Sequence, residues 1–162
     1  MTLPDGWLAP DEADELRRLA AGRTVLELGA WKGRSTVVLA EVANYVVSID
    51  RHKGIPEVGN EDSLPSYLEV VRSLDNVAIV VADFEKMVPL LDCFFDLCFV
   101  DGNHDAQSAA RDTQLAIEHV NTAGVIAFHD WDFASVRKGV RRVLGSRKPD
   151  SLVGSVAAFS VS

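Results

Sequence analysis

Acidic and imidazole side chains follow two apolar segments of the chain, at positions where they could bind a metal ion or move a proton. One pair comes after Phe95–Val100 and the other comes directly after Val125–Phe128. The four side chains are Asp101, His104, His129 and Asp130. If the two segments are neighbouring parallel strands, their ends lie roughly 5 Å apart, and these ligand types suit Mg²⁺, Mn²⁺ or another divalent cation. The alternative is that the aspartates cap helices and the histidines make ordinary hydrogen bonds.

A glycine-containing turn follows the earlier apolar segment Thr24–Leu28 and could let the backbone approach a ligand closely. Its glycines, Gly29 and Gly33, do not have the G-x-G-x-x-G spacing of dinucleotide-binding turns, and Glu27 precedes the first of them. A pyrophosphate therefore fits this turn poorly. A nucleoside ligand without charged phosphates fits better.

Two further strand ends carry acids that suit a nucleoside. Asp50 comes about twenty residues after the turn, where a carboxylate can accept hydrogen bonds from both ribose hydroxyls. Asp83 and Phe84 follow the third apolar segment and offer an acceptor for an exocyclic amine and a ring face for a base. Because an aspartate at a strand end is also a common helix cap, each acid alone is weak evidence.

Apolar segments and amphipathic segments alternate along the chain. The expected strands are Thr24–Leu28, Tyr45–Ile49, Val77–Val81, Phe95–Val100 and Val125–Phe128. The expected helices are Asp11–Ala21, one from Arg34, Pro65–Leu74, Ala106–Val120 and Ser135–Leu144. Strands that are apolar almost throughout and joined by helices indicate an α/β fold, a doubly wound, mostly parallel sheet in three α/β/α layers. Two short apolar stretches in Leu152–Val161 predict a final strand or hairpin.

Length and composition indicate one ordinary globular domain over residues 1–162, with 48% apolar and 25% charged residues. The apolar runs are too short to span a membrane, and the first twenty residues show no secretory signal, so we expect a cytoplasmic protein. A net charge of -8 disfavours nucleic acid as a partner. Cys93 and Cys98 are expected to be small buried hydrophobes.

Two segments have either a functional or an ordinary role. The long irregular stretch Arg51–Ser63 is rich in glycine, proline and charge, which is common in functional loops. A basic stretch near the C-terminus is either a solvated helix face or a surface for an anionic acceptor, nucleic acid or a protein partner. Its cations are Arg137, Lys138, Arg141, Arg142, Arg147 and Lys148.

The ordered set of motifs from Thr24 to Trp131 resembles the class I S-adenosylmethionine-dependent methyltransferases, which have a Rossmann-like fold. It is most similar to a small bacterial group with a D-G-x-H motif and a later H-D-W, related to metal-assisted catechol-type and macrolide-sugar O-methyltransferases. The segments that carry the resemblance are ELGAWKGRST, VVSIDRH, VVADF, FDLCFVDGNH and AGVIAFHDW. Trp31 departs from the pattern, because many such enzymes have a glycine there.

The resemblance implies a role for each matching residue. S-adenosylmethionine would be bound by Glu27, Gly29, Gly33 and Ser35 around the methionine part, Asp50 at the ribose, Asp83 and Phe84 beside the adenine, and Asp101. Mg²⁺ or another divalent cation would be held by Asp101 and Asp130, with His129 as the expected third ligand. Catalysis is assigned to Asp101 and His104, with His104 as a candidate general base.

Sequence and resemblance together predict methyl transfer to the hydroxyl of a small molecule such as a sugar, polyol or phenol. A homo-oligomer could complete the acceptor site, because no inserted cap is evident. The competing hypothesis is a non-catalytic module that binds the nucleoside for sensing or within a complex. A nicotinamide-dependent oxidoreductase is disfavoured by the spacing of the first turn.

Overall fold

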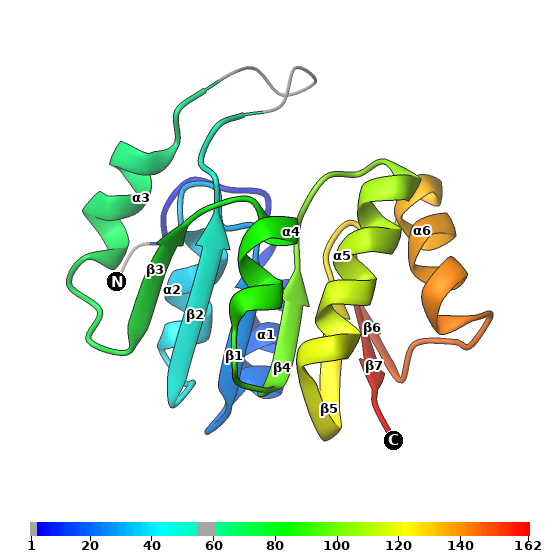
Figure 1. Cartoon of the computed structure of the whole chain (residues 1–162). Coiled ribbons are helices and arrows are strands. Elements are labelled where there is room, and N and C mark those ends of the chain that lie inside the picture. Colours follow the sequence, from blue (N-terminus) through cyan, green and yellow to red (C-terminus); the bar gives the residue numbers. More distant parts are fainter. Residues whose placement is uncertain (1–2, 55–60) are drawn as a thin grey trace.

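Seven strands form one central sheet in the computed structural model, which describes residues 3–54 and 61–162 (Figure 1). The strands are β1 (Thr24–Leu28), β2 (Tyr45–Asp50), β3 (Val77–Val81), β4 (Phe95–Val100), β5 (Val120–Phe128), β6 (Ser151–Val153) and β7 (Val156–Ser160). Their order across the sheet is β3-β2-β1-β4-β5-β7-β6, and the first five are parallel. β7 runs antiparallel to both β5 and β6, which confirms the predicted C-terminal hairpin.

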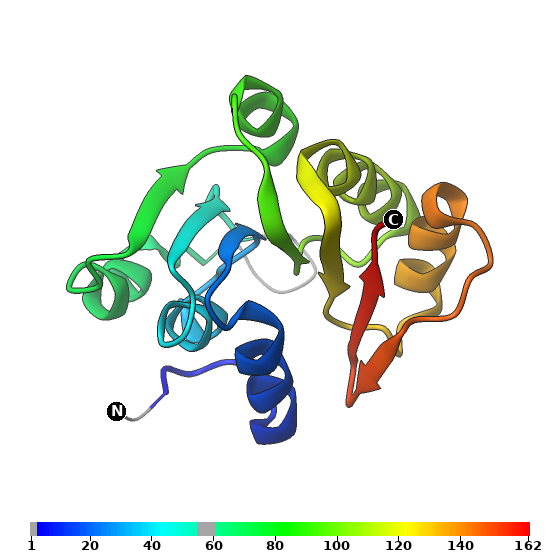
Figure 2. The ribbon, with the colours of Figure 1, turned by 90° about the horizontal axis from the view of Figure 1, so that it is seen from below.

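Helices cover both faces of this sheet, as seen along the strands in Figure 2. The helices are α1 (Pro10–Ala20), α2 (Arg34–Ala40), α3 (Leu64–Val71), α4 (Phe84–Met87), the 3₁₀ turn η1 (Val88–Leu90), α5 (Ala106–His119) and α6 (Ala134–Leu144). Helices α1, α2 and α3 lie on one face, and α4, α5 and α6 lie on the other. The predicted doubly wound, three-layer α/β/α fold is therefore confirmed.

Alternating side chains of the central strands supply one core on each face. In β1, Val25 belongs to the cluster under α1 and α2, whereas Leu26 belongs to the cluster under α5 and α6. In the neighbouring β4, Leu97 and Cys98 divide in the same way. Cys98 is thus the buried hydrophobe that was expected, but Cys93 is exposed, because it lies in the turn before β4 and outside the sheet.

The structure adds two features that the hydrophobic pattern does not predict. Helix α4 and the turn η1 lie between β3 and β4, where we expected no element. These pieces have four and three residues, too few for a helical period to be recognised. β5 begins at Val120 rather than Val125, because Val120 pairs with Phe95 before a register shift in β4.

Residues 55–60 of the irregular stretch Arg51–Ser63 lie outside the described residues. Five cations of the basic stretch are exposed on and just after α6, namely Lys138, Arg141, Arg142, Arg147 and Lys148. Among the helices of residues 3–54 and 61–162, none has the length and apolar character needed to cross a bilayer.

Candidate functional site

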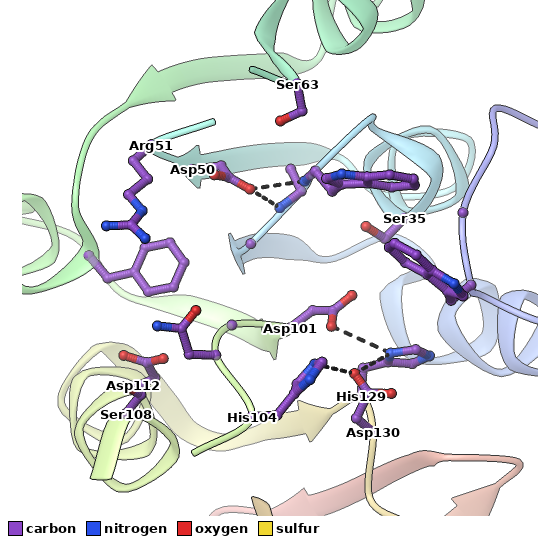
Figure 3. Close-up of a pocket in the computed structure, with 18 of the residues that line it drawn as sticks. Ser35, Asp50, Arg51, Ser63, Asp101, His104, Ser108, Asp112, His129 and Asp130 are labelled. Carbon is purple, nitrogen blue, oxygen red and sulfur yellow. Dashed lines mark hydrogen bonds and ion pairs between the residues drawn. The ribbon is translucent and has the colours of Figure 1, made fainter. Parts of the chain in front are cut away.

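A cavity of about 1040 Å³ opens at the carboxyl edge of β1, β2, β4 and β5, where polar side chains from several elements meet (Figure 3). Parallel strands all present their carboxyl ends at this edge, which is where ligands bind in open α/β sheets. Most of the predicted site residues line it: Gly29, Ser35, Asp50, Asp83, Phe84, Asp101, His104, His129 and Asp130. Glu27 and Gly33 do not.

The turn between β1 and α2 approaches the cavity through Gly29, which has a φ of 97°. A Cβ at this position would collide with the carbonyl oxygen of Asp101, so only glycine lets β1 and β4 end so close together. Asp50 fixes the same turn from β2. Its Oδ2 accepts hydrogen bonds from the backbone amides of Ala30 (2.8 Å) and Trp31 (2.9 Å), and its Oδ1 accepts one from His52 (2.6 Å).

Three of the four non-glycine residues with positive φ in the described chain line this cavity: Trp31, His52 and Asp130. Such conformations cost of order 1–3 kcal/mol each and tend to cluster at functional sites. The hydrogen bond from its amide to Asp50 holds Trp31 at a φ of 44°, at the position that departs from the pattern of the resembled family. Strain at the β1–α2 turn is thus compensated by a side chain from β2.

Glu27 and Gly33 support the turn from behind. Glu27 is fully buried, and its Oε2 accepts hydrogen bonds from Thr36 and Ser48, both at 2.6 Å. Burial raises the pKa of Glu27 to about 7. Gly33 has a φ of 89° and packs against Tyr67 of α3. Both residues position the backbone that lines the cavity, although they do not themselves form its wall.

Asp83 and Phe84 lie where β3 passes into α4, and both line the cavity. The side chain of Asp83 is 37% exposed and pairs with Lys86 at 3.0 Å. The hydrogen bond from Lys86 is the main reason that the pKa of Asp83 is lowered. Phe84 contributes a ring to the wall, whereas the Asp83 carboxylate already has a partner.

The acid and imidazole side chains after β4 and β5 do converge, as their positions predict. His104 Nε2 lies 2.8 Å from Asp130 Oδ2, and its ring stacks on Phe133 at 4.9 Å between centroids. Oxygen or nitrogen ligand atoms from Asp101, His104 and Asp130 all lie within 4.8 Å of one another. The hydrogen bond to Asp130 raises the pKa of His104. Burial would raise the pKa of Asp130, but hydrogen bonds from His104 and His129 outweigh burial and lower it.

His129 is not part of this three-residue cluster, in contrast to the expected metal set of Asp101, His129 and Asp130. Its Nδ1 lies 3.4 Å from Asp101 and 3.2 Å from Asp130, while Nε2 lies 3.4 Å from Glu12. Burial alone would lower the pKa of His129, but the two aspartates outweigh burial and raise it to about 11. The imidazole in the three-residue cluster is that of His104, whereas His129 has carboxylates near both of its ring nitrogens.

Glu12 was not recognised from the sequence, although its carboxylate contacts the segment before α1, the β6–β7 turn and His129. Its Oε1 accepts hydrogen bonds from the backbone amide (2.6 Å) and hydroxyl (2.8 Å) of Ser155 in the β6–β7 turn. Its Oε2 accepts one from the amide of Ala9 at 2.8 Å and faces His129. An acid in the first turn of a helix is so common that no sequence signal marks this one.

The segment before α1 forms part of the cavity wall, which the sequence also did not indicate. Arg34 of α2 donates hydrogen bonds to the carbonyl oxygens of Leu8 (2.8 Å) and Pro4 (2.7 Å). Trp7 packs on Trp31, with ring centroids 4.4 Å apart, although it is 71% exposed. The cavity therefore has an aromatic rim on this side.

Solved structures share this fold, and several of them are named as methyltransferases. Cofactor-bound Rv0187 from MTB is 22% identical, with 98% of this chain and 83% of that chain covered and a TM-score of 0.75. The O-methyltransferase TomG from Streptomyces achromogenes, in complex with SAM, is 21% identical over 99% and 84% of the chains, with a TM-score of 0.70. A putative O-methyltransferase from Klebsiella pneumoniae is 15% identical over 99% and 84%, with a TM-score of 0.73. At these identities the likeness establishes the fold.

A sequence search of curated proteins finds no match. A family model described as a methyltransferase domain matches residues 26–131. The matched range includes the acid–imidazole cluster, which consists of Asp101, His104 and Asp130, as well as the glycine turn and Asp50. The chain belongs to this family of methyltransferase domains.

Proposed function

We propose that this methyltransferase transfers the methyl group of S-adenosylmethionine to a hydroxyl of a small neutral molecule. The observation that carries the proposal is the convergence on one cavity of the glycine turn, Asp50 and the acid–imidazole cluster. Sites for drug-sized ligands occupy roughly 300–1,000 Å³. A cavity of about 1040 Å³ therefore has room for a nucleoside cofactor and a small acceptor together.

The residues present fit the cofactor. Gly29 lets the β1–α2 turn lie directly against the end of β4, and the cavity wall there also includes Ser35 and Asp101. These three positions would hold the methionine part. Asp50 would hold the ribose through Oδ1, which accepts only the amide of His52 and keeps a second lone pair, whereas Oδ2 already accepts two amides. When bound, S-adenosylmethionine supplies an electrophilic methyl group on a sulfonium sulfur.

The chain's own contribution to chemistry is alignment and removal of the acceptor proton. His104 is the candidate base, because one ring nitrogen is held by Asp130 at 2.8 Å and the ring is stacked on Phe133. The same end of the cavity is lined by Asp101, Asp130 and Asp132, which would repel an anionic acceptor. Aromatic and acidic walls together favour a neutral hydroxyl compound, with phenols as the first choice.

Asp101, His104 and Asp130 also fit a divalent cation, because two carboxylates and an imidazole are ligands that such ions accept. A bound cation would lower the pKa of a coordinated hydroxyl and orient it. In that case His104 would serve as a ligand rather than as the base.

The test is transfer of labelled methyl from S-adenosylmethionine to a panel of phenols, polyols and sugars, with and without a chelator. We expect transfer to at least one class, and a loss of more than 100-fold in Asp130→Asn but not in Asp92→Asn, an exposed acid outside the cavity. Loss of activity with chelator, restored by Mg²⁺, would support the cation, whereas chelator-insensitive activity that His104→Ala abolishes would support the base. Full activity of Asp130→Asn would contradict the proposal.

A further inference from the structure

Asp112 of α5 is a buried carboxylate that faces the cavity without a full set of partners. The residue is 1% exposed and lines the cavity, at the opposite end from His129 (Figure 3). Its Oδ1 is buried and has no hydrogen-bond partner among the described residues. The nearest cation, Arg111, has its Nε 3.5 Å away, at the limit of hydrogen-bond length. An unsatisfied buried acceptor costs free energy, so this carboxylate lacks donors. The oxygen that a ligand donor would meet is Oδ2, which lies on the Gly102 side of the cavity wall.

The surroundings of Asp112 are those of a base-binding pocket. Gly102, just after β4, separates it from Phe84: a Cβ on Gly102 would lie 2.6 Å from Asp112 Oδ2 and 3.2 Å from the Phe84 ring. All three residues line the same cavity. The missing side chain at Gly102 therefore leaves the carboxylate and the aromatic ring facing one point of the wall. A planar base against Phe84 would bring its edge towards Asp112.

Asp83 is less suited than Asp112 to accept a hydrogen bond from a base. It is more exposed, and Lys86 already neutralises it at 3.0 Å. We propose that Asp112 accepts a hydrogen bond from the exocyclic amine of the cofactor's adenine and so selects adenine over a 6-oxo purine. This inference rests on the proposed function, since it requires the nucleoside in this cavity.

The ionised carboxylate is an acceptor only, so it attracts an amine and repels a purine carbonyl oxygen. Burial raises the pKa of Asp112 to about 6, and at pH 8 the group is therefore still ionised. Replacement by asparagine keeps the shape but adds an amide donor, which can bond to the 6-oxo group. The substitution should thus change the preference between bases more than it changes the fold.

The experiment is calorimetric titration at pH 8 with S-adenosylhomocysteine and with S-inosylhomocysteine, its 6-oxo analogue. We expect the wild type to bind the adenosine compound about 10- to 100-fold more tightly, and Asp112→Asn to lose or reverse this preference. Asp83→Asn tests the competing residue and should keep the preference. Asp92→Asn controls for the loss of a charge outside the cavity.

An unchanged ratio in folded Asp112→Asn, or loss of the preference in Asp83→Asn alone, overturns the inference while leaving the proposed function intact. If the wild type binds neither compound, both the proposed function and the inference fail. Thermal unfolding checks that each variant is native. Asp112→Ser, which removes the carboxylate without adding bulk, gives the same comparison if the asparagine variant does not fold.

Discussion

Replacing Glu27 with glutamine should remove a pH dependence of stability that arises beneath the cavity. The carboxylate lies in β1 with no exposed surface, and the hydrogen bonds that it accepts from Thr36 and Ser48 go to the same oxygen. Its other oxygen is buried without a partner among the described residues. Burial of the charged form is the main reason that its pKa rises from 4.5 to about 7.

The direction in which folding stability changes with pH follows from which state binds the Glu27 proton more strongly. Between pH 4.5 and about 7, the folded state holds the Glu27 proton more strongly than the unfolded state does, so folding stability falls as pH rises through this window. A difference of about 2.5 pH units at 1.36 kcal/mol each corresponds to roughly 3 kcal/mol. Glu27→Gln has no proton to lose. The free energy of unfolding of the variant minus that of the wild type should therefore rise by about 3 kcal/mol from pH 4.5 to pH 8.

Urea unfolding of wild type and Glu27→Gln at several pH values between 4.5 and 8 measures this difference. Other titrating groups contribute to both proteins and largely cancel in the comparison. Glu69→Gln is the matched control, because Glu69 is exposed on α3, and its difference from wild type should be nearly flat with pH. A Glu27→Gln difference that is equally flat would refute the reasoning, since it would mean that the buried carboxyl titrates as it does in the unfolded chain.

Two other substitutions test the architecture of the site. Gly29→Ala should destabilise the protein by more than about 2 kcal/mol and abolish binding of S-adenosylhomocysteine, because its Cβ meets the Asp101 carbonyl at a positive φ. Gly22→Ala, with a positive φ but open space around it, should cost only about 1 kcal/mol, and equal losses in urea unfolding would argue against the collision. Glu12→Ala should cost about 3 kcal/mol and lower the melting temperature by roughly 6–12 °C, because it leaves three half-buried donors of Ser155 and Ala9 unpaired. Glu41→Ala, which removes only a surface pair, should cost less than about 1 kcal/mol, and a similar melting temperature for both variants would count against this role of Glu12.

Much of the fold could be predicted because its signals are local. The strands Thr24–Leu28, Val77–Val81 and Phe95–Val100 have the predicted bounds, since a short apolar run between polar turns is typical of a buried strand. The parallel arrangement follows from the helices between them. Once strands are parallel, their carboxyl ends share one edge, so Asp50 and Asp101 come to the same cavity.

Hydrophobic period and chain connectivity are thus sufficient to predict the strands, their direction and the edge at which the polar residues gather. The partners that each polar group finds depend instead on the folded chain. Glu12 meets His129 across 117 positions of the sequence, and Asp101 and Asp130 face the same ring, so His129 lies among carboxylates from separate parts of the chain. Burial likewise distinguishes Asp112 from the exposed Asp105 that caps the same helix. Electrostatics and desolvation act over distances in space, and neither can be read from the spacing of residues along the chain.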